Sequence, residues 1–298
     1  MEMDAVILLD KPAGITSAEA VRRIKRFVKP ARVGHLGTLD PFATGLLPIM
    51  IGEATKLAPF LEGGDKEYLG TIKLGVETDT LDRDGQVIRT APVPALTPER
   101  LGEVAAGFVG MITQTPPIFS AIKREGVPMY KLARRNIDIA PPPPREVEIK
   151  SLTLEASGFD RIKFVAVCSP GTYIRSLARD IGAALGTAAY LDELRRIRTS
   201  HFHIADAFAL ETVVATLEAG DASALRTLST RDAVAALPEI AVGAVAERRL
   251  RNGDSSVLDM MAPVASGHFR VISESGALVA IARATSRVTA VIERIFNS

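Results

Sequence analysis

The segment from Gly34 to Pro48 constrains the fold of this chain more than any other stretch, because it crowds three glycines, two prolines and two threonines around one aspartate, Asp40. The glycines permit backbone shapes and close approaches that a side chain would block. Pro41 fixes its own φ and disfavours the α region for the residue before it. We therefore expect Asp40 on a stiff loop rather than inside a helix, which is where a rigid scaffold often presents a functional carboxylate.

Composition places the chain among ordinary soluble globular proteins. Its 298 residues suggest about two domains, and a content of 47% hydrophobic and 24% charged residues suffices for a sizeable core. No apolar run reaches the ~18–20 residues that a membrane span needs. The first twelve residues lack a basic segment followed by a long apolar stretch, so we expect no secretory signal. Cys168 is the single cysteine, which excludes an internal disulfide and fits a cytoplasmic location.

Hydrophobic patterning predicts both strands and helices. Apolar runs predict strands at 5–9, 45–51 and 68–74, the second broken at Pro48, and partial alternation predicts strands between 146 and 167. These strands are separated by capping and turn signals, so we expect short helices between them.

The helix signals are specific at two places. Thr16 and Glu19 form a capping box for a helix that Pro30 stops. Thr97 caps a second helix that runs to about Phe108. The other predicted helices are 53–61, 173–184 and 207–218.

Two segments stand apart from this pattern. Residues 117–145 read as a long, basic, proline-rich insertion, and loops of this length are usually functional or disordered. A domain boundary is expected at Leu237–Pro238, followed by a small unit, residues 239–298. Its predicted elements are a helix at 244–251 and strands at 268–272, 277–282 and 288–292. The chain is therefore expected to be α+β: a mixed, largely antiparallel sheet flanked by helices, with a small β-rich C-terminal domain.

Basic residues are clustered although the formal net charge is only +1. Basic patches on a near-neutral protein suit phosphate contacts along a nucleic acid, and the alternative is a set of solvated helix faces. The three clusters are Arg22, Arg23, Lys25, Arg26, Lys29 and Arg32; Lys123, Arg124, Lys131, Arg134 and Arg135; and Arg195, Arg196 and Arg198.

A second motif, Cys168 to Arg175, can supply a partner for Asp40. Gly171 allows a turn, Thr172 can cap the helix that follows, and Arg175 then lies in the first helical turn. An arginine can bind a carboxylate through two parallel hydrogen bonds and fix its orientation. Arg175 is either that partner or a surface residue. Cys168 ends an apolar strand and is expected to be a buried small hydrophobe.

The remaining candidate residues suggest a base-binding site without a cofactor. Tyr68 and Tyr173 lie next to these motifs and either stack on a nucleic acid base or pack in the core. His35 can contact a substrate. It has no cysteine or second histidine at ligand spacing, so no metal site is expected. The Asp79, Asp82 and Asp84 loop lacks the final glutamate of a calcium loop. No nucleotide-binding motif is present, so no cofactor is expected.

Several segments, in order across about residues 5–200, together resemble the TruB-type tRNA pseudouridine synthases. They are Lys11–Ser17, Gly34–Pro48, Lys66–Tyr68, Gln114–Pro117 with Ser120, Ala121, Lys123, Gly126 and Tyr130, and Gly171–Arg175. The resemblance implies isomerisation of a uridine in the T-loop of tRNA, in a catalytic domain at 1–238 whose insertion closes over the RNA. Residues 239–298 weakly resemble the PUA-like module of many bacterial members.

The resemblance also assigns roles to single residues. It implies that Asp40 is the catalytic aspartate, that Tyr68 stacks on the flipped base and helps remove the C5 proton, and that Arg175 pairs with Asp40. His35 matches a residue that contacts the target loop, and Leu194 matches an apolar residue of the uracil pocket. Three further residues match substrate-binding or nearby positions: Lys11, Lys123 and Tyr173. Two departures, Pro170 where many relatives have lysine and Glu67 where a basic residue is frequent, lie outside these roles.

The implied reaction needs no cofactor, because it exchanges an N1–C1′ bond for a C5–C1′ bond with no redox change. Asp40 has three open routes: attack at C1′, addition to C6, or removal of the 2′ proton. The expected partner is tRNA, bound by a monomer with no membrane or protein partner. The alternatives are a synthase acting on another RNA, an RNA-folding chaperone and, more distantly, a DNA glycosylase.

Overall fold

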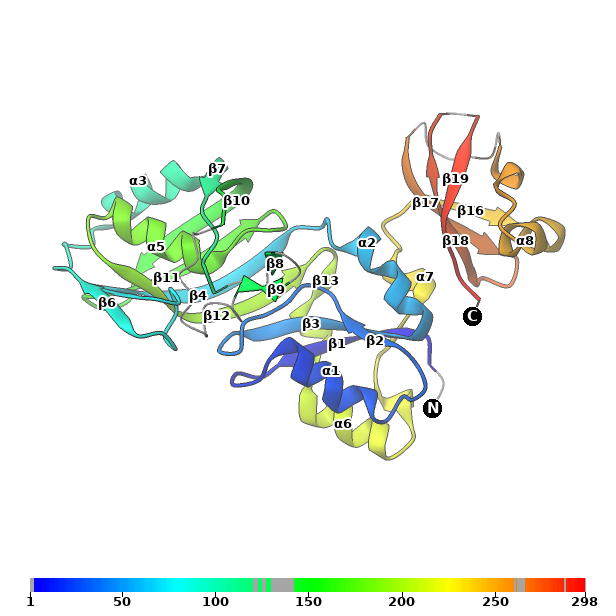
Figure 1. Cartoon of the computed structure of the whole chain (residues 1–298), viewed down its shortest axis with the longest axis horizontal. Helices are drawn as coiled ribbons and strands as arrows, with labels where there is room; N and C mark the ends of the chain where they lie inside the picture. The colour runs from blue at the N-terminus through cyan, green and yellow to red at the C-terminus, as the bar shows by residue number, and fades with distance from the viewer. Residues whose placement is uncertain are drawn as a thin grey trace.

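A computed structural model describes residues 3–119, 123–124, 127–129, 142–259, 261, 266–286 and 288–297. In this part of the chain, eleven strands form one mixed sheet that runs through most of the molecule (Figure 1). The strands are β1 (Ala5–Lys11), β2 (Val33–His35), β3 (Thr44–Ile51), β4 (Lys66–Leu74), β7 (Gly110–Gln114), β10 (Arg145–Ala156), β11 (Arg161–Cys168), β12 (Ala189–Thr199), β13 (Phe202–His203), β14 (Phe208–Ala209) and β15 (Leu228–Ser229).

The main path through the sheet is β14-β1-β3-β12-β4-β11-β10-β7. Only β1–β14 and β3–β12 are parallel neighbours, and the other pairs are antiparallel. The predicted mixed, largely antiparallel sheet is thus confirmed.

Helices lie beside the large sheet in two groups, α3 with α5 and α1 with α6 (Figure 1). The helices are α1 (Ser17–Lys25), α2 (Ala58–Leu61), α3 (Pro98–Phe108), α5 (Ile174–Ala184), α6 (Leu210–Glu218), α7 (Thr230–Ala233) and α8 (Ala244–Arg251), with 3₁₀ turns at Gly52–Leu57, Ile204–Asp206, Ala222–Ala224 and Ser255–Leu258. One buried cluster contains Ile24 of α1, Leu101 of α3, Ile181 of α5 and Val213 of α6 together with strand residues. The burial of this apolar surface is the main stabilising term of the fold.

Several predicted elements differ in detail from the structure. The Thr16 cap is present, its hydroxyl accepting a hydrogen bond from Glu19 N at 3.0 Å, but the Glu19 carboxylate pairs with Arg22 and Arg23 instead of closing the capping box. The helix ends at Lys25, before the predicted stop.

The predicted break at Pro48 was wrong, because β3 continues through it. The carbonyl of Pro48 accepts a hydrogen bond from Leu36 N just beyond the end of β2. N and C=O of one strand residue point to the same side, so the missing N–H of proline falls where the neighbouring strand has already ended.

The helix after the second motif also begins differently. Tyr173 is the N-cap of α5, and its N–H is bound by Oε1 of Gln114 at 2.7 Å. The hydroxyl of Thr172, the predicted cap, donates instead to the Ser169 carbonyl. Further strands were not predicted. They are β2, β7, β12, β14 and β15 of the large sheet, the hairpin of β5 (Val76–Thr78) with β6 (Val87–Thr90), and β16 (Glu239–Val242).

Strand β12 joins the two halves of the sheet. It pairs with β4 along most of its length, but with β3 only where Arg195 and Arg196 lie opposite Thr44 and Gly45. The register of β12 on β4 shifts just after Arg196, and such irregularities often lie next to active sites. The loop that carries Asp40 leads directly into this junction.

Gly45 makes the junction possible, and its replacement is expected to be severe. Its φ is +103°, and a Cβ there would lie 2.3 Å from the Arg196 carbonyl oxygen. We expect Gly45→Ala to lower the free energy of unfolding by about 3 kcal/mol or more, measured by urea titration. Gly102→Ala is the control. In α3, a Cβ at this position would meet no atom within 4 Å beyond its neighbours and the backbone of its own helix, so the free energy of unfolding should rise by about 0.5–1 kcal/mol. Equal midpoints for both variants would contradict this packing.

The C-terminal unit forms a four-stranded sheet of β16, β17 (Gly267–Ser273), β18 (Leu278–Ala284) and β19 (Ala290–Ile295), with α8 beside it. Ile272, Ile281 and Phe296 of this unit share one apolar cluster with Val6 and Met50 of the large sheet. We propose 239–298 as a separate unit that docks through this shared core. In the described residues, no helix has the length and apolarity to cross a membrane.

Candidate active site

Asp40 lies on the loop between β2 and β3, as expected from its glycines and prolines. Both hydrogen-bonding groups of the preceding residue, Leu39, are bound by the buried Ser17 hydroxyl, with Leu39 N at 2.9 Å and Leu39 O at 3.1 Å. The Asp40 carbonyl accepts from Ala43 N, and Gly14 N donates to Pro41 O. The loop is therefore fixed on both sides of Asp40, whose side chain remains 33% exposed.

Arg175 of α5 binds Asp40, although the two residues are 135 positions apart in the sequence. Nη2 donates to Asp40 Oδ1 at 3.3 Å, and Nε lies 2.9 Å from Oδ2 in an ionic contact that is not an aligned hydrogen bond. The guanidinium also donates to the carbonyl oxygens of Thr80 at 2.9 Å and Phe119 at 2.8 Å. Arg175 is buried, so four contacts hold the orientation of its fork.

Asp82 is a second carboxylate at this guanidinium, and sequence reasoning missed it. Its Oδ2 lies 3.3 Å from Arg175 Nη1, while its Oδ1 accepts hydrogen bonds from Thr80 Oγ1 at 2.6 Å and Asp84 N at 3.1 Å. Burial raises the pKa of Asp82, and Thr80 and Arg175 oppose the rise. Arg175 is thus held between two carboxylates, one buried and one facing solvent.

Tyr68 of β4 and Leu194 and Arg196 of β12 lie at the junction into which the Asp40 loop leads. Arg196 lies directly opposite Tyr68 across β12 and β4, and Leu194 lies opposite Gly70. All three side chains are buried. Burial raises the pKa of the Tyr68 phenol, whereas the charge of Arg196 lowers it. The structure therefore brings a phenol and an apolar side chain to the same junction as Asp40.

Lys11 and His35 complete the surroundings of the loop. The Lys11 ammonium is buried and donates to the carbonyl oxygens of Pro12, Ile15 and Pro41 at 2.8, 2.8 and 3.3 Å. Burial lowers the pKa of Lys11 to about 8, although the charge of Asp40 opposes this. Burial and then the charge of Arg196 lower the pKa of His35, and both favour the neutral imidazole.

Two predicted site residues remain. Tyr173 makes contacts of its own, and Lys123 is described only by its backbone. Tyr173 caps α5, and the guanidinium of Arg145 stacks on its ring at 4.6 Å. The backbone of Lys123 belongs to the β8 (Lys123–Arg124) and β9 (Val127–Pro128) hairpin, but its side chain lies outside the described residues.

The family model described as "TruB family pseudouridylate synthase (N terminal domain)" matches residues 25–174, half of the chain. The model described as "tRNA pseudouridylate synthase B C-terminal domain" matches residues 175–229. The chain belongs to the TruB family of pseudouridylate synthases. The matched residues include Asp40, Tyr68 and Arg175.

Relatives of this TruB family chain match it over most of its length. The tRNA pseudouridine synthase B of Geotalea uraniireducens is 47% identical over 209 residues, which cover 70% of this chain and 67% of that protein. That of Methylobacillus flagellatus is 40% identical over 285 residues, covering 96% and 92%. One chain of the solved "Crystal Structure of a Cbf5-Nop10-Gar1 Complex" has a TM-score of 0.76 at 26% identity, covering 98% of this chain and 85% of its own. These matches confirm the predicted α+β fold class.

The basic clusters of this TruB family chain differ in exposure. Lys25, Arg26, Lys29 and Arg32 are exposed around the end of α1. The third cluster is not a free patch: Arg195 pairs with Asp10, Arg198 pairs with Glu67, and Arg196 is fully buried. The side chains of the second cluster lie outside the described residues.

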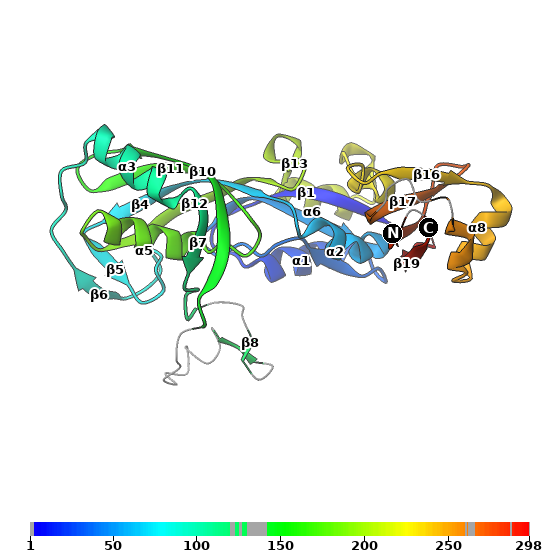
Figure 2. The same ribbon diagram turned by 90° about the horizontal axis from the view of Figure 1, so that it is seen from above.

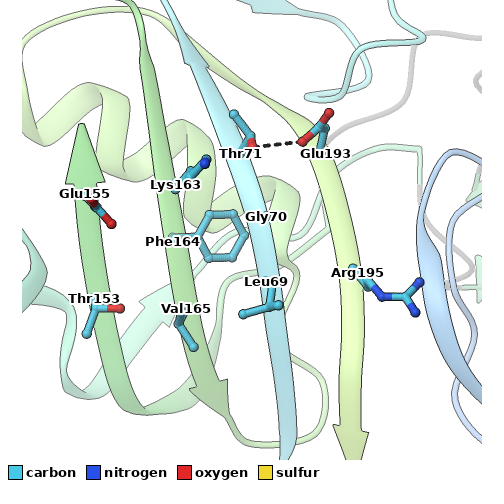
Figure 3. A pocket seen from close by; sticks show the side chains of 10 residues that line it. All are labelled: Leu69, Gly70, Thr71, Thr153, Glu155, Lys163, Phe164, Val165, Glu193 and Arg195. Carbon is cyan, nitrogen blue, oxygen red and sulfur yellow. Dashed lines mark hydrogen bonds between the residues drawn. The ribbon is translucent and has the colours of Figure 1, made fainter. Parts of the chain in front are cut away.

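A cavity of about 360 Å³ is formed by residues of β4, β10, β11 and β12, and none of the predicted site residues lines it (Figure 3). Leu69, Glu193 and Arg195 line it, and each is a sequence neighbour of Tyr68, Leu194 or Arg196. Successive strand residues point to opposite faces. The cavity therefore belongs to the other face of the sheet, and we do not assign the reaction to it.

The buried Lys11 predicts a pH dependence of stability. Its pKa is about 8 in the folded protein and 10.5 in the unfolded chain, so the unfolded state binds more protons between these values. The free energy of unfolding should therefore rise with pH in this window, relative to Lys11→Met. The gain should be about 1–3 kcal/mol, because the hydrogen bonds from the ammonium to three carbonyls offset part of the desolvation. The measurement is urea unfolding of both proteins from pH 7.5 to 10.5; parallel curves would contradict the burial of a charged ammonium.

Proposed function

We propose that this chain converts a uridine in the T-loop of tRNA to pseudouridine, with Asp40 as the catalytic carboxylate. The observation that carries the proposal is the Asp40–Arg175–Asp82 arrangement beside Tyr68 and Leu194. Its relatives are named tRNA pseudouridine synthase B, which supports tRNA as the substrate and fits the expected cytoplasmic location. The T-loop as the target rests on the motifs in the sequence.

The reaction requires an ionised carboxylate that is aimed at the nucleoside. Asp40 has the exposure to reach a substrate, and the Arg175 fork fixes the direction of its carboxylate. Asp82 holds the other edge of the same guanidinium. This geometry serves each of the three routes equally: attack at C1′, addition to C6, or removal of the 2′ proton.

The target base must leave the RNA stack to reach Asp40, which costs a few kcal/mol. Tyr68 offers a flat ring, and stacking on an aromatic side chain is worth ~1–3 kcal/mol per base. Leu194 adds an apolar wall that excludes water. The detached uracil can then turn between these side chains and present C5 to C1′, and the proposed role of the Tyr68 hydroxyl is to help remove the C5 proton.

All groups in this arrangement come from one chain, so the site can be complete without a second subunit, and we propose a monomer that needs no protein partner. Figures 1 and 2 show α1 and the β8–β9 hairpin on the same side of the sheet. We propose that this side faces the T-arm of the tRNA, with the exposed basic residues of α1 contacting its phosphates and the insertion, including Lys123, closing over the loop. His35 and Tyr173 are proposed to contact the target loop.

A substrate competition tests the proposed function. The protein is given equal amounts of an unmodified tRNA transcript and a ribosomal RNA fragment, and pseudouridine is counted in each. We expect product in the tRNA alone. Product mainly in the other RNA would point to a different substrate, and RNA refolding without product would point to the chaperone alternative.

The proposed phosphate contacts predict a change in salt dependence. The double variant Arg26→Gln with Lys29→Gln should weaken tRNA binding, and the slope of log K against log salt should fall by about 1.5, since each lost phosphate contact removes about 0.7–0.9. The control is Arg161→Gln with Lys163→Gln, which removes two charges from exposed positions of β11. Filter binding at 50–300 mM salt measures both, and equal slopes would exclude the basic segment at the end of α1 as a contact.

A further inference from the structure

Arg196 is the largest fully buried side chain of the described protein, and it is charged. Within the described ranges, no carboxylate lies at ion-pair distance from its guanidinium. Its Nε donates to the Leu46 carbonyl at 2.8 Å, and Nη2 donates to the carbonyls of Gly37 at 2.9 Å and Leu36 at 3.5 Å. A buried charge without a counter-ion is costly, so its location calls for an explanation beyond packing.

The three acceptors lie at the two ends of the catalytic loop. Leu36 and Gly37 precede Asp40, and Leu46 lies on β3 just after the loop. The contact is close, because a Cβ at Gly37, where φ is +69°, would lie 3.1 Å from Arg196 Nη1. One planar fork therefore ties both ends of the loop to β12.

The same guanidinium faces other groups of the site. Arg196 is the cross-strand partner of Tyr68 on β4, and cross-strand partners have side chains on the same face. Its charge lowers the pKa of Tyr68 and, after burial, also lowers the pKa of His35. Arg196 thus links the Asp40 loop to Tyr68, and its charge acts on His35.

We propose that Arg196 is a positioning residue of the isomerisation, which holds the Asp40 loop and Tyr68 in one fixed arrangement. The inference rests on the proposed function, since it concerns the same site. Arginine is required rather than lysine, because only the planar fork reaches carbonyls on two segments at once.

The test compares Arg196→Lys and Arg196→Met with Arg195→Met. Arg195 is the neighbouring residue, pairs with Asp10 and points to the opposite face, where Figure 3 shows it at the rim of the cavity. Single-turnover rates on tRNA, kcat and KM are measured per folded molecule. We expect a fall of about 10- to 100-fold in kcat for both Arg196 variants, with KM within about threefold, because a small misplacement of reacting groups costs that much. Arg195→Met should stay within about threefold of the wild type.

A second readout does not depend on turnover. The chain has four histidines, and NMR titration of their rings, with His35 assigned through His35→Gln, gives the pKa of His35. That pKa should rise in Arg196→Met and stay low in Arg196→Lys, which keeps the charge.

Three results would each overturn the proposal: a rate loss explained by the unfolded fraction alone, a wild-type rate, or an unchanged His35 pKa in folded Arg196→Met. If Arg196→Met does not fold, the kcat and KM of Arg196→Lys decide it. Absence of product with the wild type would instead count against the proposed function.

Discussion

Replacing Asp40 by asparagine is expected to abolish pseudouridine formation while tRNA binding stays within about threefold of the wild type. Asparagine keeps the size of the side chain but carries no charge, so it can neither attack the nucleoside nor act as a base. We expect a loss of about 10⁴-fold or more in single-turnover rate. The binding surface does not depend on this carboxylate, and therefore Kd should change little.

The matched control is Asp84→Asn, which removes the same charge from an exposed position near the site. Its rate should equal that of the wild type. Turnover by Asp40→Asn above a few percent of the wild-type rate would remove Asp40 from the mechanism. A large loss with both variants would indicate a general effect of net charge.

Arg175→Lys is expected to lower kcat by about 10²- to 10³-fold, although the charge is retained. Lysine is a point charge and lacks the planar fork that contacts Asp40, Asp82 and the Thr80 and Phe119 carbonyls together. Some of these buried acceptors would be left without a donor, so stability should also fall by about 1–3 kcal/mol.

Arg179→Lys, one turn further along α5, serves as the control. Arg179 is partly exposed and pairs with its neighbour Asp180, so both its rate and its melting temperature should remain close to the wild type. If Arg175→Lys matched this control in kcat, orientation of Asp40 by the guanidinium would be ruled out. The double variant Arg175→Lys with Asp82→Asn would then show whether Asp82 accounts for the loss in stability.

The main features of the site could be predicted from the sequence because they rest on local chemistry. The density of glycine and proline around Asp40 predicts a fixed loop, and the structure has one. The contact of Arg175 with Asp40 was one of two alternatives on residue chemistry alone, and only the resemblance to the TruB-type synthases favoured it.

What the sequence could not predict depends on contacts between distant segments. Asp82 lies in a loop that resembles an incomplete calcium site, and only the fold brings it to Arg175. Arg195, Arg196 and Arg198 looked like one basic patch, yet Arg196 is buried. The twofold period of a strand could have separated Arg195 from Arg196, but the register shift after Arg196 is a property of the paired sheet.

The start of α5 is a second case in which a contact between distant segments could not be predicted from the sequence. Thr172 is a good cap by residue type, whereas the structure uses the Oε1 atom of Gln114, 59 residues earlier, to bind Tyr173 N. A tertiary contact replaces the local one. Buried Gln114 thereby links β7 to the helix that carries Arg175.

The most direct test of the account is site-resolved detection of pseudouridine on an unmodified tRNA transcript, with no cofactor added, for the wild type and Asp40→Ala. The account predicts pseudouridine at a single T-loop uridine with the wild type and none with the variant. Product at other positions, or equal product from both proteins, would contradict it.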